Sequence, residues 1–126
     1  MERINFSKIP WEIRGPDQLW RELERKLAEK PFDVIDQNYA LDSVKGVFWK
    51  KSIYANVAGE NGEFIGTLKV EVDTMLTSGL RSTLPYSFLV GIHGNKRNSG
   101  GYQQLREFAK KLVDEILPRE AERLIV

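Results

Sequence analysis

The clearest pattern in the chain is a period of two that begins at Val47 and is interrupted once. Apolar and polar residues alternate from Val47 to Val57 and again from Phe64 to Val72, on either side of Gly59-Glu60-Asn61-Gly62. Alternation of this length is typical of strands with one buried face. Because Asn-Gly readily adopts the positive φ angles of a tight turn, the segment predicts a β-hairpin.

The hairpin register follows from the requirement that apolar positions face apolar positions. With Asn61-Gly62 as a two-residue turn, the numbers of facing residues sum to 123, and a four-residue loop gives 121. The sum of 122 is excluded because it sets apolar residues against polar ones throughout. The two-residue turn also sets Glu60 against Glu63, a like-charge pair. It predicts that Ile53 faces Val70, Ala55 faces Leu68, Tyr54 faces Lys69 and Lys50 faces Asp73, whereas the longer loop sets Lys50 against Glu71.

The faces of the hairpin follow from the same alternation. Phe64 shares the core side with Gly66 and Leu68, and Ile65 falls on the outward side. A third long strand is predicted from Pro85 to His93, with Pro85 at its start because proline cannot donate a ladder hydrogen bond. Weaker alternation predicts a short first strand near residues 3–7. Residues 31–46 predict a loop with one short strand near 33–36.

Two segments have the 3.6-residue period of amphipathic helices. The first begins at Gly15-Pro16-Asp17, because proline suits the first helical turn and an acid favours the positive end of the helix dipole. It ends near Lys30. The second carries an apolar stripe made of Tyr102, Leu105, Phe108, Ala109, Leu112, Val113, Ile116 and Leu117. Residues 119–126 are expected to add a helical turn or two, and their apolar end to dock on the core or on a second subunit.

Together these elements predict a single α+β domain over residues 1–126. An antiparallel sheet of three to four strands is packed on one face by two amphipathic helices, in the chain order β-α-β-β-β-α. The buried faces of the strands and the two helical stripes then form one core.

Composition removes several classes of function. The chain has no cysteine and one histidine, His93, which excludes disulfide frameworks, thiolate chemistry and metal sites built from Cys or several His. With no nucleophile motif and no metal-ligand spacing, the sequence favours a non-catalytic protein over an enzyme, with no cofactor and no metal. Its net charge of +1 does not make it a generally basic protein. No apolar run has signal-peptide or membrane-helix length, so a cytoplasmic location without membrane contact is expected.

Glu71 and Asp73 share one strand face and have two interpretations. Their spacing of about 7 Å along the strand suits an acid–base pair. The alternative is cross-strand pairing with Lys50 and Lys69, which keeps both acids ionised. The register favours this structural pairing.

The outward face of the sheet carries more apolar residues than solvation requires. They are Phe48, Tyr54, Ile65 and Leu89. Such a patch favours contact with a protein partner, or with a second copy in a homodimer, unless residues 31–46 cover it. Base stacking is disfavoured, because Glu71 and Asp73 on the same face repel phosphate. The leading hypothesis is therefore a small non-catalytic binding protein that contacts its partner through the outward sheet face.

The alternative hypothesis rests on a segment without acids. Between Asp73 and Glu107 lie 33 residues that include no Asp or Glu. The Gly-rich loop 94–101 and the start of the last helix fall in this segment, and backbone N–H groups at a helix start favour anions. The alternative is therefore binding of an anionic ligand or nucleic acid, which salt weakens steeply. The residues assigned to this site are His93, Lys96, Arg97, Ser99, Gly100, Gly101 and Arg106.

Overall fold

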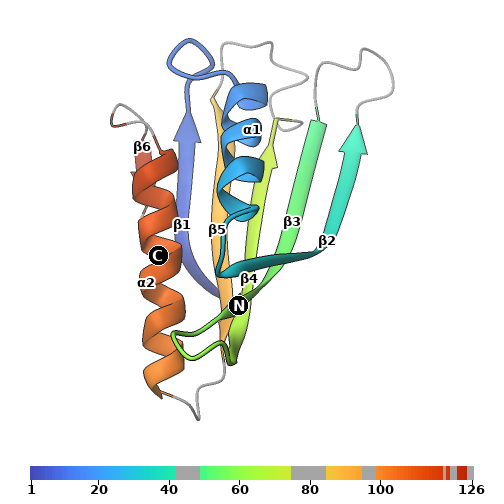
Figure 1. The fold of residues 1–126 in the computed structure, drawn as a ribbon. Coiled ribbons are helices and arrows are strands. Elements are labelled where there is room, and N and C mark those ends of the chain that lie inside the picture. Colours follow the sequence, from blue (N-terminus) through green and yellow to red (C-terminus); the bar gives the residue numbers. More distant parts are fainter. Residues whose placement is uncertain (42–48, 75–84, 95–98, 118, 120–121, 125–126) are drawn as a thin grey trace.

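The computed structural model describes residues 1–41, 49–74, 85–94, 99–117, 119 and 122–124. Within these residues it has the predicted α+β class, with two helices and a six-stranded sheet in the order β2-β3-β4-β5-β1-β6 (Figure 1). Every strand pair is antiparallel. The elements are β1 (Glu2–Ile9), α1 (Pro16–Leu27), β2 (Phe32–Leu41), β3 (Trp49–Ala58), β4 (Phe64–Asp73), β5 (Tyr86–Gly94), α2 (Ser99–Ile116) and β6 (Glu122–Leu124).

The sheet is wider than the three to four strands predicted, and both unexpected strands lie at its edges. β2 fills ten residues of the segment predicted to be mostly loop, and β6 replaces the helical turns predicted within 119–126. β2 pairs with β3, so Phe32 faces Val57 and Leu41 faces Trp49. An edge strand is hydrogen-bonded to a neighbour on one side only, and its own residue pattern does not reveal which strand that is. β6 pairs with β1 so that Leu124 faces Phe6, while the rest of the apolar end predicted to dock, residues 125–126, lies outside the described residues.

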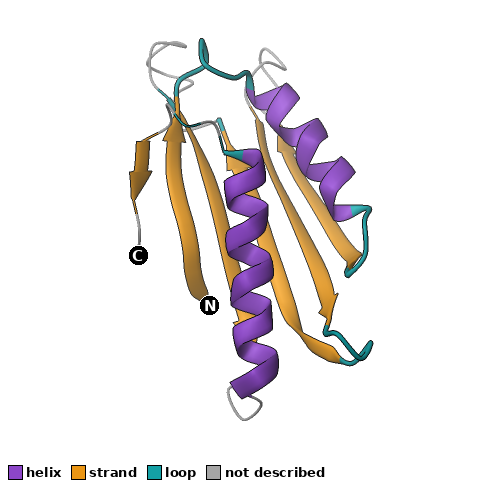
Figure 2. Cartoon of the chain, turned by 60° about the vertical axis from the view of Figure 1, so that its left-hand side comes forward, coloured by secondary structure: helices purple, strands orange, loops and turns teal. Residues whose placement is uncertain are grey.

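Both helices lie on the same side of the sheet, and the two views agree on this (Figures 1 and 2). The predicted stripe of α1 is buried at Leu19, Trp20, Leu23 and Leu27. The stripe of α2 is buried at Leu105, Ala109, Leu112, Val113 and Ile116. Beneath the helices, β3, β4 and β5 contribute Ile53, Leu68, Val70, Val72, Phe88, Val90 and Ile92 to one core cluster. The other side of the sheet has no helix among the described residues.

The hairpin register is confirmed along most of β3 and β4. Ile53 faces Val70, Tyr54 faces Lys69 and Lys50 faces Asp73, as a sum of 123 requires. The turn itself differs from the prediction. Gly59 N–H donates to the Glu63 carbonyl over 2.7 Å, and Gly62 N–H donates to the Gly59 carbonyl over 3.0 Å. A three-residue loop with Gly62 at a φ of 81° results, a common hairpin connection that takes Glu60 away from Glu63.

A β-bulge next to this loop reverses the predicted orientation of two residues. The register shifts between Val57 and Ala58, so Ala58 faces Phe64. Ile65 then turns into the core with 2% of its surface exposed, and Phe64 is 65% exposed. Gly66 makes the bulge possible: its φ is 150°, and a Cβ there would collide with the His93 carbonyl oxygen and Leu105 of α2.

A second bulge, in β1, turns polar residues toward the core. The register between β1 and β5 shifts between Arg3 and Asn5, which leaves Asn5 and Ser7 buried. Asn5 Nδ2 donates to the Phe88 carbonyl over 3.2 Å, and Ser7 Oγ donates to Asn5 Oδ1 over 2.7 Å. Because these side chains have hydrogen-bond partners, their burial is tolerated. Phe6, which lies between them in the sequence, points to the side of the sheet without helices.

Candidate functional site: the uncovered sheet face

The side of the sheet opposite the helices is the open face, and its residues are fixed by the strand register. They form four rows that cross the strands. The first row holds Asp33, Asn56, Thr67 and His93, and the second holds Tyr54, Lys69, Gly91 and Arg3. The third holds Ser52, Glu71, Leu89 and Phe6, and the fourth holds Lys50, Asp73, Ser87 and Lys8.

The β3–β4 part of the open face is polar, and several of its groups are bound to one another. Lys50 Nζ lies 3.3 Å from Glu71 Oε1, and Ser52 Oγ donates to the same oxygen over 3.2 Å. The Lys69 ammonium lies 5.8 Å from the centre of the Tyr54 ring. Glu71 therefore has the structural role that the register favoured. Lys50 faces Asp73 in the backbone, but its ammonium reaches diagonally to Glu71.

The β5–β1 part of the open face has an apolar centre, bordered by Arg3, Lys8, Ser87 and His93. Leu89 faces Phe6 across the two strands, and the Arg3 guanidinium lies 5.9 Å from the centre of the Phe6 ring. Met1 lies over Gly91, where a Cβ would collide with the methionine sulfur. Met1 is 51% exposed, whereas Leu89 is 7% exposed. The open face therefore has an apolar part next to a polar part whose charged groups interact with one another.

Of the four residues predicted to form the partner-binding patch, the three that the structure describes are not brought together. Tyr54 and Leu89 lie on the open face as predicted, but β4 separates them, with Lys69 and Glu71 between. Ile65 is a correction: the bulge places it in the core, where it cannot contact a partner. Phe48 lies outside the described residues.

The apolar residues that lie near Leu89 or are exposed elsewhere were not predicted from the sequence. Phe6 was assigned to a weak first strand without a partner, and its place beside Leu89 depends on the pairing of β1 with β5. The exposed Phe64 depends on the bulge, and the exposed Val34 and Ile35 lie in β2, which was predicted to be mostly loop. The weak alternation of Ile4 and Phe6 with polar neighbours was the only signal in the sequence for any of them.

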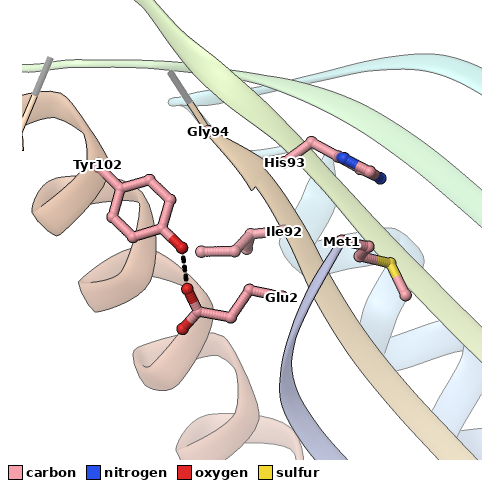
Figure 3. Close-up of a pocket in the computed structure, with 6 residues that line it drawn as sticks. All are labelled: Met1, Glu2, Ile92, His93, Gly94 and Tyr102. Carbon is pink, nitrogen blue, oxygen red and sulfur yellow. Dashed lines mark hydrogen bonds between the residues drawn. The ribbon is translucent and has the colours of Figure 1, made fainter. Parts of the chain in front are cut away.

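Among the described residues predicted to bind an anion, only His93 lines the small cavity near the start of α2. The cavity, of about 280 Å³, is lined by Met1, Glu2, Ile92, His93, Gly94 and Tyr102. Tyr102 and Glu2 point toward one another, whereas His93 points away from both (Figure 3). His93 is exposed, and so are Ser99 and Gly100 in the first turn of α2, while Gly101 is buried. Lys96 and Arg97 lie outside the described residues.

The Glu2 carboxylate lies between two side chains of α2 that could otherwise bind an anion, Tyr102 and Arg106. The Tyr102 hydroxyl donates to Glu2 Oε1, and Arg106 Nε lies 3.1 Å from Glu2 Oε2. Tyr102 also packs against Gly94, where a Cβ would collide with the ring. Glu2 therefore ties β1 to the first turns of α2, and Arg106, predicted as an anion ligand, forms an ion pair within the chain. His93, which could act as a general base, points away from the Glu2 carboxylate.

Metal chemistry and membrane insertion find no support in the described residues. They contain no group of three or more His, Asp or Glu side chains placed to hold a metal ion. Neither described helix has the length and apolar run needed to cross a bilayer. Comparison with protein-family models, curated proteins and solved structures finds no match. The functional inference therefore rests on the geometry of the open face.

Proposed function

We propose that this chain is a small non-catalytic binding protein that docks a protein partner on the open face of its sheet. The observation that carries the proposal is the placement of both helices on one side, which leaves the other side without a helical cover among the described residues (Figure 2). A protein surface with an apolar centre beside polar groups is typical of a binding interface. Phe6, Leu89 and Met1 supply the apolar part, and Tyr54 supplies an aromatic side chain of the kind enriched at interfaces.

The charges of the open face favour a protein partner over nucleic acid. Its third and fourth rows combine Glu71 and Asp73 with Lys50 and Lys8, so both signs are interspersed. A phosphate backbone requires a surface of predominantly positive charge. Partner proteins carry charges of both signs and can therefore place an opposite charge against each charged residue of such a surface.

Catalysis on this face is disfavoured because its reactive groups are engaged with one another. Glu71 accepts from Ser52 and is paired with Lys50, while Lys69 lies against Tyr54. His93, the sole histidine, stands in the first row, three strand rows from Asp73. Glu71 and Lys69 are thus engaged in contacts that stabilise the surface, and His93 has no acid from the fourth row within reach to act with it.

Site-directed photo-crosslinking tests the proposal. Tyr54 is replaced by a photoreactive phenylalanine derivative, which keeps an aromatic ring on the open face, and Gln103 on the exposed side of α2 is replaced in the control. We expect adducts from position 54 in cells and none from position 103. The partner identified by mass is then purified, and Tyr54→Lys is expected to weaken its binding at least about tenfold, since burying an unpaired charge costs several kcal/mol.

The control substitution Gln103→Lys adds the same charge to the helical side and should leave binding unchanged. Adducts from position 103 and none from position 54 would move the interface to the helices and overturn the proposal. Binding to oligonucleotides that falls steeply with salt, in place of protein adducts, would favour the anion-binding alternative.

A further inference from the structure

We propose that the partner of the open face is a second copy of this chain, stacked face to face about a two-fold axis that runs across the strands. This inference rests on the proposed function and names its partner. The observation behind it is the order of residues in the two middle rows. On β4, Lys69 stands in the second row and Glu71 in the third, and on β5 Gly91 stands in the second row and Leu89 in the third. β4 thus carries opposite charges in adjacent rows, and β5 carries a large apolar residue next to a glycine.

A two-fold axis across the strands exchanges the second and third rows. Lys69 of each copy then lies over Glu71 of the other, which creates two symmetric ion pairs. Leu89 of each copy lies over Gly91 of the other, where it meets the Met1 side chain that covers this glycine and adds an apolar contact. Such self-complementarity is what an isologous interface requires.

The remaining positions are compatible with the same axis. Arg3 of each copy lies over the Phe6 ring of the other, a contact of the kind that these residues already make within the chain. The first and fourth rows are also exchanged, so Asp73 meets Thr67 and no described side chains of like charge are opposed on β3, β4 and β5. Charge complementarity therefore favours this arrangement.

A second face-to-face arrangement opposes like charges. An axis along β5 keeps each residue in its row and exchanges β1 with β4, which sets Arg3 over Lys69 of the second copy. Like charges directly opposed are destabilising.

The open face is large enough for such a dimer. Five strands about 4.8 Å apart and four rows about 6.8 Å apart outline roughly 600 Å² of flat area. A standard interface buries about 800 Å² of accessible surface on each partner, and a surface roughened by side chains exceeds its flat outline. Two sheets pack face to face about 10 Å apart with their strands within about 30° of one another, which this two-fold permits.

The test uses two charge-reversing variants of the purified chain, Lys69→Glu and Glu71→Lys. In Lys69→Glu both middle rows of β4 are acidic, and in Glu71→Lys both are basic, so each variant repels itself. Sedimentation velocity over a concentration series should show a dimer for the native chain and a dimer at least about tenfold weaker for either variant. An equimolar mixture of the two variants should restore association, because acidic β4 then faces basic β4 at both contacts.

The matched controls are Lys110→Glu and Glu107→Lys, which make the same changes of charge on exposed residues of α2. They should dimerise like the native chain, and melting curves confirm that every variant is folded. A monomeric native chain, undisturbed dimerisation by the two variants, or a mixture that fails to associate would each overturn the inference. If the native chain is monomeric while position 54 crosslinks to a different protein, the second-copy inference fails and the proposed function stands. If neither occurs, both fail.

Discussion

The two faces of the sheet are built from the same strands, yet they differ in what covers them. On β5, Phe88, Val90 and Ile92 are fully buried under the helices, while Leu89 and His93 alternate with them on the open face. The helical face is filled mainly by apolar side chains, with Asn5 and Ser7 as buried, hydrogen-bonded exceptions. The open face combines an apolar part with paired charges, which is the composition of a surface that can stand in water and also dock. The difference separates residues that stabilise the fold from residues available to a partner.

The largest expected effect separates the two faces by one kind of substitution. Phe88→Ala removes a fully buried ring from the helical face and should lower the free energy of unfolding by about 3–5 kcal/mol. Tyr54→Ala removes a half-buried ring from the open face and should cost about 1 kcal/mol or less. Denaturant unfolding measures both. Equal losses would show that the open face is as much a part of the core as the helical face.

Gly66→Ala tests the close approach of α2 to the sheet. The added methyl group would collide with the His93 carbonyl and Leu105, on a backbone with a φ of 150°. We expect a loss of about 2–4 kcal/mol from backbone strain and overpacking. The control is Gly15→Ala, where no atom lies within 4 Å of the new methyl group, and its cost should stay below about 1 kcal/mol. A tolerated Gly66→Ala would mean that the bulge, and the burial of Ile65, is wrong.

Asn5→Ala tests the polar residues that face the helices. The substitution leaves the Phe88 carbonyl and the Ser7 hydroxyl without their partner in a buried site. A loss of about 1–3 kcal/mol is expected. Lys8→Ala, on the open face of the same strand, should change stability by about 0.5 kcal/mol or less. If the Lys8 variant loses more than the Asn5 variant, the faces of β1 have been exchanged.

The smallest effect concerns Tyr86, whose hydroxyl donates to the Arg14 carbonyl over 2.8 Å. Burial raises the pKa of Tyr86 above the ordinary tyrosine range. Because the folded state holds this proton more tightly than the unfolded state, stability is retained below the unfolded pKa of about 10 and falls as the pH rises further. Tyr86→Phe should cost about 0.5–1.5 kcal/mol near neutral pH and lessen the fall above pH ~10. Melting curves from neutral to strongly alkaline pH measure both, and an equally steep alkaline fall in the variant would contradict the assignment.

The helices and the β3–β4 register were predictable because local periodicity determines them. Leu19 to Leu27 and Leu105 to Ile116 follow the helical period, and Ile53 faces Val70 as the alternation requires. The reversal of Phe64 and Ile65 was not predictable, since it depends on a bulge that accommodates α2 against Gly66. The width of the sheet was missed for a related reason, because edge strands such as β2 are stabilised by a partner rather than by their own pattern.

The candidate site was predicted only in part. Tyr54 and Leu89 were assigned to the correct face by alternation, but Phe6 and Met1 join Leu89 only through the pairing of β1 with β5 and a bulge in β1. The ion pair of Arg106 with Glu2, more than a hundred residues away in sequence, was not predicted. Contacts between residues so far apart in the chain produce no periodic pattern in a single sequence.

Lysine footprinting of the native assembly tests the central claim most directly, whether the assembly is a dimer or a complex with another protein. Lys69 and Lys8 report on the open face, and Lys110 and Lys111 report on the exposed side of α2. Acetylation rates are compared between the assembly and the dissociated chain by mass spectrometry. The proposal predicts that Lys69 reacts several-fold more slowly in the assembly while Lys110 and Lys111 react at unchanged rates. Protection of Lys110 and Lys111 with Lys69 still fully reactive would contradict it.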